Sequence, residues 1–353
     1  MAITSRLLDR AAAVSAALTT PFLPDDYLGL VNPLWSAREL RGRIEQVRRE
    51  AGGATSLTIR PGRGWTSHTA GQYVGVGVEV AGVRHWRSYS LTGPPRADGL
   101  ITITVKAAGL VSQHLSYRTP VTSYLQLRQA DGAFTLPATI SRRLLWITAG
   151  SGVTPVMGML RSLDELGELP DAVHHHSALN RDEVIFGEEL RAMAARHPRL
   201  RLIEQHTDRD GLLALTDLER VVPDWRERET WVCGPAGLLD AAEQHWADAG
   251  LSQLLHVERF APKVLPGADV TSGSATFSRS GVTTPVTGTL LDAGEAAGVL
   301  MPSGCRMGIC YSCVAPLLQG QVRDLRTGDI RGEPGDLIQT CVSAPAGDCA
   351  IDL

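Results

Sequence analysis

The sequence predicts a multidomain protein that contains an antiparallel β-barrel, an α/β domain built on a parallel sheet, and a small strand-rich domain. Three observations lead to this fold class. The chain has 353 residues, which is too long for one ordinary domain and suits two or three. Short strands separated by Gly and Pro give way, after about residue 140, to strands that alternate with helices. Four of the six cysteines then gather within residues 305–341.

Residues 1–37 are predicted to form an N-terminal helix followed by a proline-rich arm. Apolar side chains from Leu7 to Leu18 recur at helical intervals, which favours an amphipathic helix, with a weak secretory signal over residues 11–23 as the alternative. The sequence lacks the roughly 18 consecutive apolar residues that a membrane span needs. We therefore expect a soluble protein that has no membrane span of its own.

Residues 38–140 are predicted to form the antiparallel barrel. Short strand-like runs in this region are separated by Gly and Pro, which is typical of barrels with closely spaced turns. The predicted strands are residues 55–60, 72–80, 101–106 and 123–128.

Residues 141–260 have the alternating pattern of a parallel sheet covered by helices. The predicted strands are residues 144–148, 172–179, 199–205 and 229–234, and the predicted helices include residues 155–167 and 237–250. A run of three histidines, His174 to His176, lies on one of these strands. Neighbouring residues on a strand point to opposite faces, so we expect ordinary strand residues there and not a metal site.

One turn of the α/β domain suggests a dinucleotide. A predicted strand leads into Gly150-Ser-Gly152-Val-Thr-Pro155 and then a helix, with Thr154 expected as the N-cap and Pro155 at the first helical position. A helix N-terminus reached through glycines can bind a pyrophosphate by its free N–H groups. Because Gly-x-Gly is common, a plain strand-to-helix turn is the alternative. Cys233 ends another strand, at the carboxyl edge of the sheet where ligands of α/β folds collect.

A linker is predicted at residues 261–270, and residues 271–353 are predicted to form the strand-rich domain. Its cysteines follow C-x4-C-x2-C with a fourth cysteine downstream, which is the spacing of a plant-type 2Fe-2S ferredoxin. A zinc site is the alternative, although zinc sites usually pair two Cys-x2-Cys hooks. The four candidate iron ligands are Cys305, Cys310, Cys313 and Cys341.

The residues around these cysteines suit a metal cluster. The loop must bend sharply and turn its N–H groups toward sulfur, so small residues are needed at Gly304 and Gly308. Residues 305–313 closely resemble plant-type ferredoxins, which implies a β-grasp fold. Cysteines at cluster spacing point to the reducing cytosol, and we expect the leftover Cys349 to be an inert thiol.

Four motifs occur in the order and at the intervals of one known family. They are Arg87-Ser-Tyr-Ser90, Gly109-Leu-Val-Ser112, Gly150-Ser-Gly152-Val-Thr-Pro155 and Cys233-Gly-Pro235. Over residues 38–260 the chain resembles the ferredoxin-NADP reductase superfamily, and the ferredoxin-like domain extends the resemblance to nearly the whole chain. The resemblance implies an FAD-binding barrel, an NAD(P)-binding α/β domain and a 2Fe-2S ferredoxin domain.

The resemblance also implies roles for single residues. Arg87 would bind an FAD phosphate, Tyr89 would stack on the flavin or its ribityl chain, and Ser90 would approach flavin N5. Glu258 and Phe260 would lie near the flavin, with a plain linker entry as the alternative. The catalytic candidates are Ser90, Cys233 and Glu258. The cofactor-binding candidates are Arg87, Ser88, Tyr89, Ser90, Lys106, Gly109, Val111, Ser112, Phe260, Gly150, Ser151, Gly152, Thr154, Pro155, Arg181, Cys233, Gly234 and Pro235.

The implied parts predict a mechanism. Nicotinamide gives two electrons as a hydride whereas a 2Fe-2S cluster takes one, so a flavin must stand between them. The protein would align the two rings and exclude water. Cys233 could be a catalytic thiol, but we favour a positioning role. Arg181, near the end of the second strand of the sheet, is the best placed cation for the 2′-phosphate of NADPH, so we expect NADPH as donor, with NADH also possible.

The predicted partner is an electron-acceptor protein. Residues 271–353 carry eight acidic residues against five arginines, a net charge of −3 out of −4 for the chain, which would attract a basic acceptor and gives no attraction to nucleic acid. The arm at residues 24–35 resembles reductases that feed membrane-bound di-iron acyl-CoA desaturases in actinobacteria. This implies a cytoplasmic protein that reaches the membrane through its partner. The alternatives are a Rieske oxygenase or soluble di-iron hydroxylase as acceptor, and a pure electron carrier or redox sensor without FAD.

Overall fold

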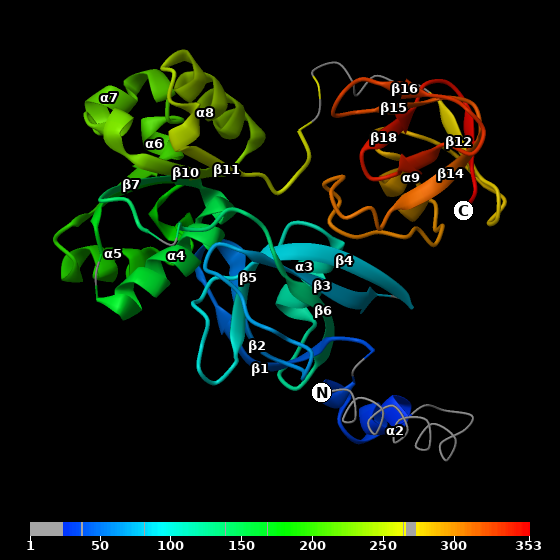
Figure 1. The fold of residues 1–353 in the computed structure, drawn as a ribbon, viewed down its shortest axis with the longest axis horizontal. Helices are drawn as coiled ribbons and strands as arrows, with labels where there is room; N and C mark the ends of the chain where they lie inside the picture. Colours follow the sequence, from blue (N-terminus) through cyan, green and yellow to red (C-terminus); the bar gives the residue numbers. More distant parts are fainter. Residues whose placement is uncertain are drawn as a thin grey trace, which may run out of the picture.

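The computed structural model describes residues 24–36, 38–80, 82–137, 139–167, 169–263, 265 and 273–353 (Figure 1). The amphipathic helix expected from Leu7 to Leu18 lies outside these residues. The described part of the arm contains helix α2 (Pro24–Val31) and the short 3-10 helix η1 (Pro33–Trp35). Within the described residues, no helix is both long enough and apolar enough to cross a lipid bilayer.

The first sheet is antiparallel and closes into a barrel. Its spatial strand order is β4-β3-β6-β1-β2-β5, and a bridge between Leu91 and Ile103 joins the two outer strands. Apolar side chains from every strand fill the interior, and helix α3 adds Val111 and Leu115 to this core. The strands predicted at 55–60, 72–80, 101–106 and 123–128 are confirmed as β2, β3, β5 and β6. The elements are β1 (Arg41–Arg49), η2 (Ala51–Gly53), β2 (Ala54–Pro61), β3 (Tyr73–Val80), β4 (Val83–Ser90), β5 (Ile101–Lys106), α3 (Leu110–Tyr117) and β6 (Tyr124–Asp131).

The second sheet is parallel, with the order β11-β10-β7-β8-β9, and helices cover both of its faces. Successive residues of β7 alternate between the two faces: Trp146 packs with helices α4 and α5, whereas Leu145 and Ile147 pack with helices α7 and α8. This burial on both faces explains why the strands read as nearly continuous apolar runs.

The predicted α/β pattern is confirmed. The strands are β7 (Arg143–Ala149), β8 (Asp171–Ala178), β9 (Leu200–His206), β10 (Glu229–Cys233) and β11 (Leu255–Glu258). The helices are α4 (Val153–Leu166), α5 (Gly187–Arg196), α6 (Thr207–Asp210), α7 (Leu218–Val221) and α8 (Ala236–Asp248), with 3-10 turns η3 (Gly150–Gly152), η4 (Arg181–Glu183), η5 (Leu215–Asp217), η6 (Trp225–Glu227) and η7 (Ser252–Leu254).

The C-terminal domain has the β-grasp arrangement. A helix packs on a mixed five-stranded sheet of spatial order β13-β12-β19-β14-β17. The strands that come first and last along the chain, β12 and β19, are neighbours in this sheet and run parallel. A three-stranded sheet, β16-β15-β18, completes the domain. Phe277 and Ile351 are fully buried where β12 and β19 meet. The elements are β12 (Ser274–Phe277), β13 (Val282–Pro285), α9 (Leu290–Ala296), β14 (Val314–Gln319), β15 (Val322–Asp324), β16 (Ile330–Arg331), β17 (Leu337–Gln339), β18 (Ser343–Pro345) and β19 (Cys349–Ile351).

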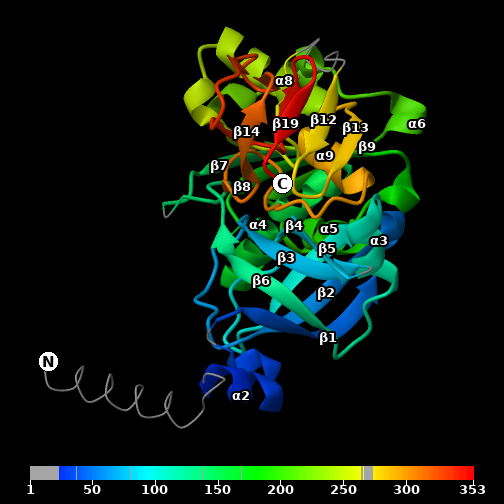
Figure 2. The same cartoon turned by 90° about the vertical axis from the view of Figure 1, so that its right-hand side faces the viewer.

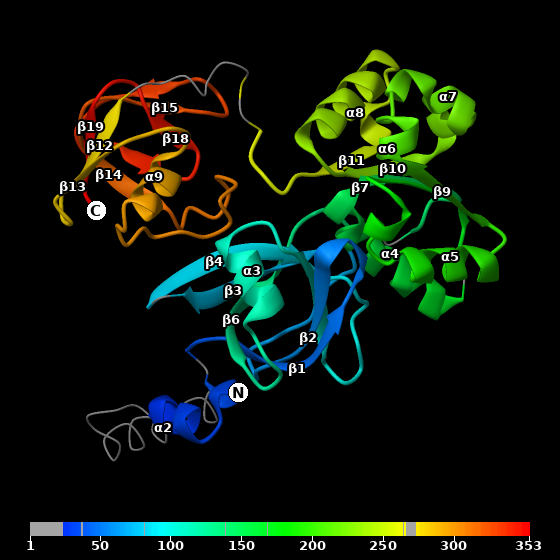
Figure 3. The ribbon, with the colours of Figure 1, turned by 180° about the vertical axis from the view of Figure 1, so that it is seen from behind.

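The barrel lies between the other two domains. The α/β domain packs against one side of it, while the long loop between α9 and β14 reaches down from the C-terminal domain toward β3 and β4 (Figures 1 and 3). The view in Figure 2 shows the C-terminal domain above these two barrel strands. The loop that carries three cysteines, residues 304–313, therefore faces the barrel.

Candidate functional site

The cysteine loop, residues 304–313, turns backbone N–H groups toward sulfur as predicted. The Cys305 sulfur accepts hydrogen bonds from the N–H groups of Met307 (3.3 Å) and Cys310 (3.4 Å), and the Cys310 sulfur accepts one from the N–H of Cys305 (3.2 Å). Arg306 and Tyr311 adopt positive φ angles of 59° and 55°, which non-glycine residues rarely do. This strain lets the backbone wrap around the sulfur atoms.

The two glycines of the loop are needed for the expected reason. A Cβ atom on Gly304 would lie 2.8 Å from the Cβ of Ser312, and one on Gly308, where φ is +72°, would overlap the guanidinium of Arg326. Arg326 and Gln339 both donate to the carbonyl oxygen of Gly308 at 2.9 Å. The loop is thus fixed from outside by side chains that follow it in the sequence.

The four predicted iron ligands form two pairs. Cys305 and Cys310 are linked through their backbone N–H groups, and the sulfurs of Cys313 and Cys341 lie 3.2 Å apart. Among the described residues, no three His, Cys, Asp or Glu side chains converge on a site for a single ion. Two pairs of sulfur donors supplied with N–H groups suit two bridged irons better than one zinc ion, so the residues fit a 2Fe-2S cluster. Cys349 is buried on β19 and is not one of the four predicted ligands.

The residues expected around FAD line one cavity of about 270 Å³, here called the barrel cavity. Arg87, Tyr89 and Ser90 line it from β4, and Gly109 to Ser112 line it from the start of α3. The Ser112 hydroxyl is used within α3, where it accepts from the N–H of Gly109 at 2.8 Å and so shapes the turn. The described residues lining the cavity are Arg87, Ser88, Tyr89, Ser90, Thr104, Lys106, Gly109, Leu110, Val111, Ser112, Ser151, Thr154 and Phe260.

Basic groups and free N–H groups make this cavity suitable for a pyrophosphate. Arg87, the first residue of the motif on β4, is half-buried, and burial lowers its pKa. Lys106 lies at the rim and pairs with Glu183 at 3.1 Å, so part of its charge is already balanced. The N-terminal N–H groups of α3 add a positive helix end. The donor set therefore fits the phosphates of FAD.

A second cavity of about 410 Å³ lies at the carboxyl edge of the parallel sheet. This sheet-edge cavity joins the glycine turn η3 to the Gly234–Pro235 turn after β10. A Cβ atom on Gly152 would overlap the carbonyl oxygen of Cys233, so glycine is required where the two turns touch. The described residues lining the cavity are Lys106, Ala149, Gly150, Ser151, Gly152, Gly234, Pro235, Ala236, Leu239, Arg259, Phe260 and Ala261.

The start of helix α4 differs from the prediction. The helix begins at Val153 after the N-cap Gly152, so Thr154 is not the N-cap and Pro155 is not the first helical residue. The reason is that η3 runs directly into α4 without an extended residue between them. The Thr154 hydroxyl donates to the carbonyl of Ser151 at 2.9 Å and caps no N–H group. Pro155 still lies in the first turn, where its missing N–H costs no hydrogen bond.

Arg181 is exposed on η4, shortly after β8, as the sequence suggested. It lies outside the described linings of the barrel and sheet-edge cavities. The adjacent Glu183 reaches Lys106 of the barrel. The three histidines are core residues of β8: the Thr148 hydroxyl contacts both His174 (2.8 Å) and His176 (2.7 Å).

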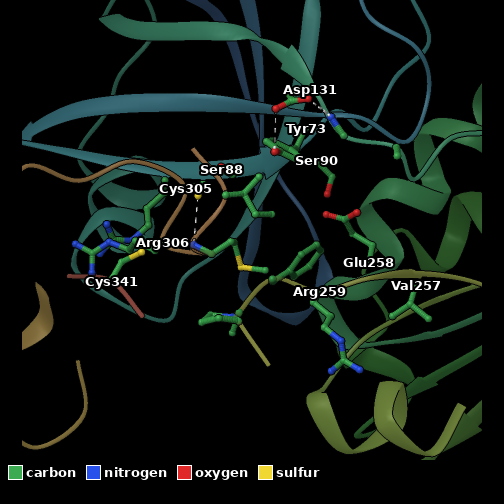
Figure 4. A pocket seen from close by; sticks show the side chains of 18 of the residues that line it. Tyr73, Ser88, Ser90, Asp131, Val257, Glu258, Arg259, Cys305, Arg306 and Cys341 are labelled. Carbon is green, nitrogen blue, oxygen red and sulfur yellow. Dashed lines mark hydrogen bonds between the residues drawn. The ribbon is translucent and has the colours of Figure 1, made fainter. Parts of the chain in front are cut away.

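A third and larger cavity, of about 720 Å³, connects the candidate flavin residues to the cysteine loop (Figure 4). Arg87 and Ser90 line it from the barrel. Glu258, at the end of β11, and Phe260, just after it, line it from the α/β domain. Cys305 and Cys341 line it from the C-terminal domain. In Figure 4, Ser90 and Glu258 point toward one another while Cys305 and Cys341 lie across the space. This central cavity is where a flavin ring could face an iron cluster.

Titratable groups in the central cavity are strongly influenced by burial. Burial, with a contribution from the charge of Asp131, raises the pKa of Glu258 to about 7. Burial also raises the pKa of Tyr73 to about 12, helped by Asp131, which accepts a hydrogen bond from its hydroxyl at 3.3 Å. Glu258 therefore exchanges its proton near neutral pH.

Cys233 is fully buried in the core of the α/β domain. Burial and the nearby Glu258 raise the pKa of its thiol well above the ordinary value, so the sulfur is protonated and a poor nucleophile. This favours the positioning role over a catalytic thiol.

Sequence reasoning did not single out Asp131, Arg259, Arg306 or Arg326. Arg259 pairs with Asp240 and Glu243 of α8, and Arg306 pairs with Asp292 and Glu295 of α9. Asp131 directly precedes the glycine that ends the barrel, and this position could have been noticed. The arginines could not, because their partners are known only once the helices are in place.

Comparisons with known proteins agree with this geometry. Residues 66–136 match the oxidoreductase FAD-binding domain, and residues 275–346 match the 2Fe-2S iron-sulfur cluster binding domain. An NADPH oxidoreductase of Mycobacterium tuberculosis (strain ATCC 25618 / H37Rv) is 51% identical over 349 residues, covering 96% of this chain and 91% of the relative. The chain belongs to the ferredoxin-NADP reductase superfamily with a C-terminal 2Fe-2S domain.

Other relatives of this reductase are components of oxygenases. The ferredoxin reductase component of 3-ketosteroid-9-alpha-monooxygenase from the same organism is 32% identical over 285 residues, covering 74% of this chain and 78% of the relative. The structure of phthalate dioxygenase reductase is similar in fold, with a TM-score of 0.65 at 22% identity, covering 89% of this chain and 98% of that one. The protein is thus an NAD(P)H oxidoreductase that uses FAD and a 2Fe-2S cluster to transfer electrons.

Proposed function

We propose that this reductase takes its electrons from NADPH and delivers them from its ferredoxin domain to a membrane-bound di-iron acyl-CoA desaturase. The observation that carries the proposed path is the central cavity, which has candidate flavin residues on one wall and two candidate iron ligands on another. FAD, when bound, can accept two electrons from the donor and release them one at a time.

In the barrel cavity, we assign binding and orientation to four groups. Arg87 and the N-terminus of α3 hold the phosphates of FAD, Tyr89 packs on the flavin or its ribityl chain, and Ser90 lies close to the reacting edge of the ring. The lining of the cavity supports this, because strand β4 and the start of helix α3, which are separate in the sequence, face one space. Lys106 contributes at the rim, where Glu183 limits its charge.

In the sheet-edge cavity, the glycine turn and the turn at Gly234 and Pro235 cradle the nicotinamide nucleotide. The backbone contact between Gly152 and the carbonyl of Cys233 holds the two turns together, and the neutral Cys233 thiol packs in the core behind them, so Cys233 acts by positioning the turns. Phe260 lines all three cavities, so it can separate the nicotinamide from the flavin until both are aligned.

Glu258 holds a proton next to the flavin position. Its pKa of about 7 allows it to take up or release that proton at neutral pH without a large energy cost. Burial is the main cause of this raised pKa, and the charge of Asp131, which faces the same cavity, adds to it by repulsion. We assign proton transfer at this site to Glu258, and we assign alignment of the reacting edge of the flavin ring to Ser90.

The acceptor would bind to the ferredoxin domain through charge. The excess of acidic residues at 271–353 supports a partner with a basic surface, and association should weaken as salt rises because exposed charges are screened within about 10 Å at 0.1 M. The desaturase itself is supported by the resemblance of the arm at residues 24–35. A desaturase partner would bring the reductase to the membrane surface.

Reconstitution tests the acceptor. Purified reductase, NADPH, stearoyl-CoA, O2 and a stearoyl-CoA desaturase in lipid vesicles should yield oleoyl-CoA and water, and the yield should fall with added salt. Omission of the reductase and replacement of NADPH by NADP⁺ are the controls. No product, although NADPH reduces the cluster of the same preparation, would remove the desaturase from the proposal and leave the reductase in place.

The second candidate acceptor is the terminal component of an oxygenase. It is favoured by the relatives named as reductase components of steroid and glycine betaine monooxygenases. In a parallel assay with a Rieske oxygenase, product formation faster than with the desaturase would favour this second candidate.

A further inference from the structure

A charged side chain of the barrel connects to the cysteine loop. Arg128, on β6, stacks over the ring of Trp86 on β4, with 4.5 Å from its guanidinium carbon to the ring centre. From this position its Nη1 donates a hydrogen bond to the hydroxyl of Ser312 at 3.3 Å. Gly75 on β3 leaves the space for the stem of Arg128, because a Cβ there would lie 3.0 Å from the arginine Cδ.

Ser312 connects Arg128 to the proposed metal site. It lies between Cys310 and Cys313, and its hydroxyl and N–H both hydrogen-bond the Cys310 sulfur. The N–H of Cys305 donates to the same sulfur at 3.2 Å. A hydroxyl has one proton and two lone pairs, so Ser312 can accept from Arg128 and donate to sulfur at the same time.

Other polar groups near this contact are less able to anchor the two domains. His85 of β4 lies 4.0 Å from Glu295 of α9, but burial lowers the pKa of His85, which leaves it mainly neutral at pH 7. Arg306 is already paired within its own domain with Asp292 and Glu295. Among the described residues at this contact, Arg128 is therefore the charged group of the barrel that bonds directly to the cysteine loop.

Hydrogen bonds and positive charge near the sulfurs of an iron–sulfur cluster raise its reduction potential, since they stabilise the added electron. The chain from Trp86 through Arg128 and Ser312 to Cys310 crosses a domain boundary. It exists only while the ferredoxin domain lies against the barrel. The same contact can therefore both hold the domain and change the chemistry of the cluster.

We propose that Arg128 is a positioning residue that raises the reduction potential of the cluster when the ferredoxin domain is docked on the barrel. In the docked state the cluster then accepts one electron from the flavin more readily. When the domain moves away, the bond from Arg128 to Ser312 is lost, the potential falls, and the cluster gives its electron more readily to an acceptor. This inference rests on the FAD and 2Fe-2S assignment and not on which acceptor is used.

The test is an anaerobic redox titration of the cluster in the full-length holoenzyme, with mediators and dithionite, followed by electron paramagnetic resonance. Arg128→Ala should lower the reduction potential of the cluster. The expected change is about tenfold in the equilibrium constant for electron transfer from flavin to cluster, which is about 59 mV for a one-electron couple. Ser312→Ala should shift the potential in the same direction. The double variant should shift it by less than the sum of the two, because both belong to one chain of contacts.

The matched control is Arg226→Ala. Arg226 also stacks on a tryptophan, with 4.6 Å from its guanidinium carbon to the ring centre of Trp225. It pairs with Glu219 of helix α7, which lies on the side of the α/β domain away from the C-terminal domain (Figure 1). Its removal should leave the potential unchanged. Arg128→Lys, which keeps the charge, should recover part of the shift.

An Arg128→Ala protein that keeps full iron and FAD content and has the wild-type cluster potential would overturn the proposal. Additive effects of Arg128→Ala and Ser312→Ala would overturn it as well. Because dithionite reduces the cluster directly, these results hold even if NADPH failed to reduce it, so failure of the proposed function would be seen separately.

Discussion

The cysteine loop and the two cavities proposed for nucleotides are built in different ways. Three of the four proposed sulfur ligands lie within residues 305–313, so a short stretch of sequence carries most of that site. The barrel and sheet-edge cavities take their linings from strands and turns spread from Arg87 to Ala261. A local site is all or none, because each ligand bonds the metal directly, whereas a dispersed site loses affinity by degrees as single contacts are removed.

The largest effect is expected in the cysteine loop. Cys310→Ala removes one of the four proposed iron ligands, so the cluster should be lost and NADPH-driven reduction of a one-electron acceptor protein should fall by at least about 100-fold. FAD content and the reduction of FAD by NADPH should remain. Iron analysis and stopped-flow absorbance check both. Cys349→Ala, which removes a buried thiol outside the cluster, should keep the iron; equal iron loss in both variants would contradict the assignment of ligands.

A smaller effect is expected where two turns of the dispersed site touch. Gly152→Ala places a methyl group against the carbonyl of Cys233, so the α/β domain should lose about 1–3 kcal/mol of stability and the KM for NADPH should rise about tenfold. Urea unfolding followed by the fluorescence of the buried tryptophans, together with steady-state kinetics, measures this. Gly237→Ala is the control, because a Cβ at Gly237 in helix α8 meets no atom within 4 Å. It should be neutral or slightly stabilising.

A shift with pH is expected at Glu258. The carboxyl of Glu258 has an ordinary pKa of 4.5 in the unfolded chain and a pKa of about 7 in the folded protein. Between pH 4.5 and pH 7 the unfolded chain therefore loses this proton more readily than the folded protein does, so the free energy of unfolding falls as the pH rises through this range. The rate of flavin reduction should show a break near pH 7 that Glu258→Gln removes. Asp131→Asn removes a repelling charge and should move the break down by about one unit. A break that stays at pH 7 in both variants would assign it to another group.

The smallest effect is expected at Arg181, which is exposed and lies outside the described cavity linings. Arg181→Ala should raise the KM for NADPH by about fivefold and leave that for NADH nearly unchanged, since only NADPH carries the 2′-phosphate. NADH is the internal control. Equal changes for both nucleotides would remove Arg181 from the nucleotide site.

The same difference explains how far the sequence predicts the molecule. The cysteine spacing predicts the cluster because its ligands are near neighbours, and the order of strands and helices predicts the three folds. The predicted start of α4 was wrong by two residues. The glycine turn continues directly into the helix, whereas the sequence Val-Thr-Pro suggested a separate N-cap at Thr154. Asp131, Arg128 and Arg306 interact with side chains on elements that are distant in the sequence. A local sequence pattern cannot predict such contacts.

The most direct test of the relay is an anaerobic titration of the holoenzyme with NADPH, read at wavelengths of flavin and cluster. Two electrons for FAD and one for the cluster predict that both chromophores bleach, with an end point of about 1.5 equivalents of NADPH. Bleaching of the flavin alone at about one equivalent, with a cluster that dithionite still reduces, would contradict the path through the central cavity.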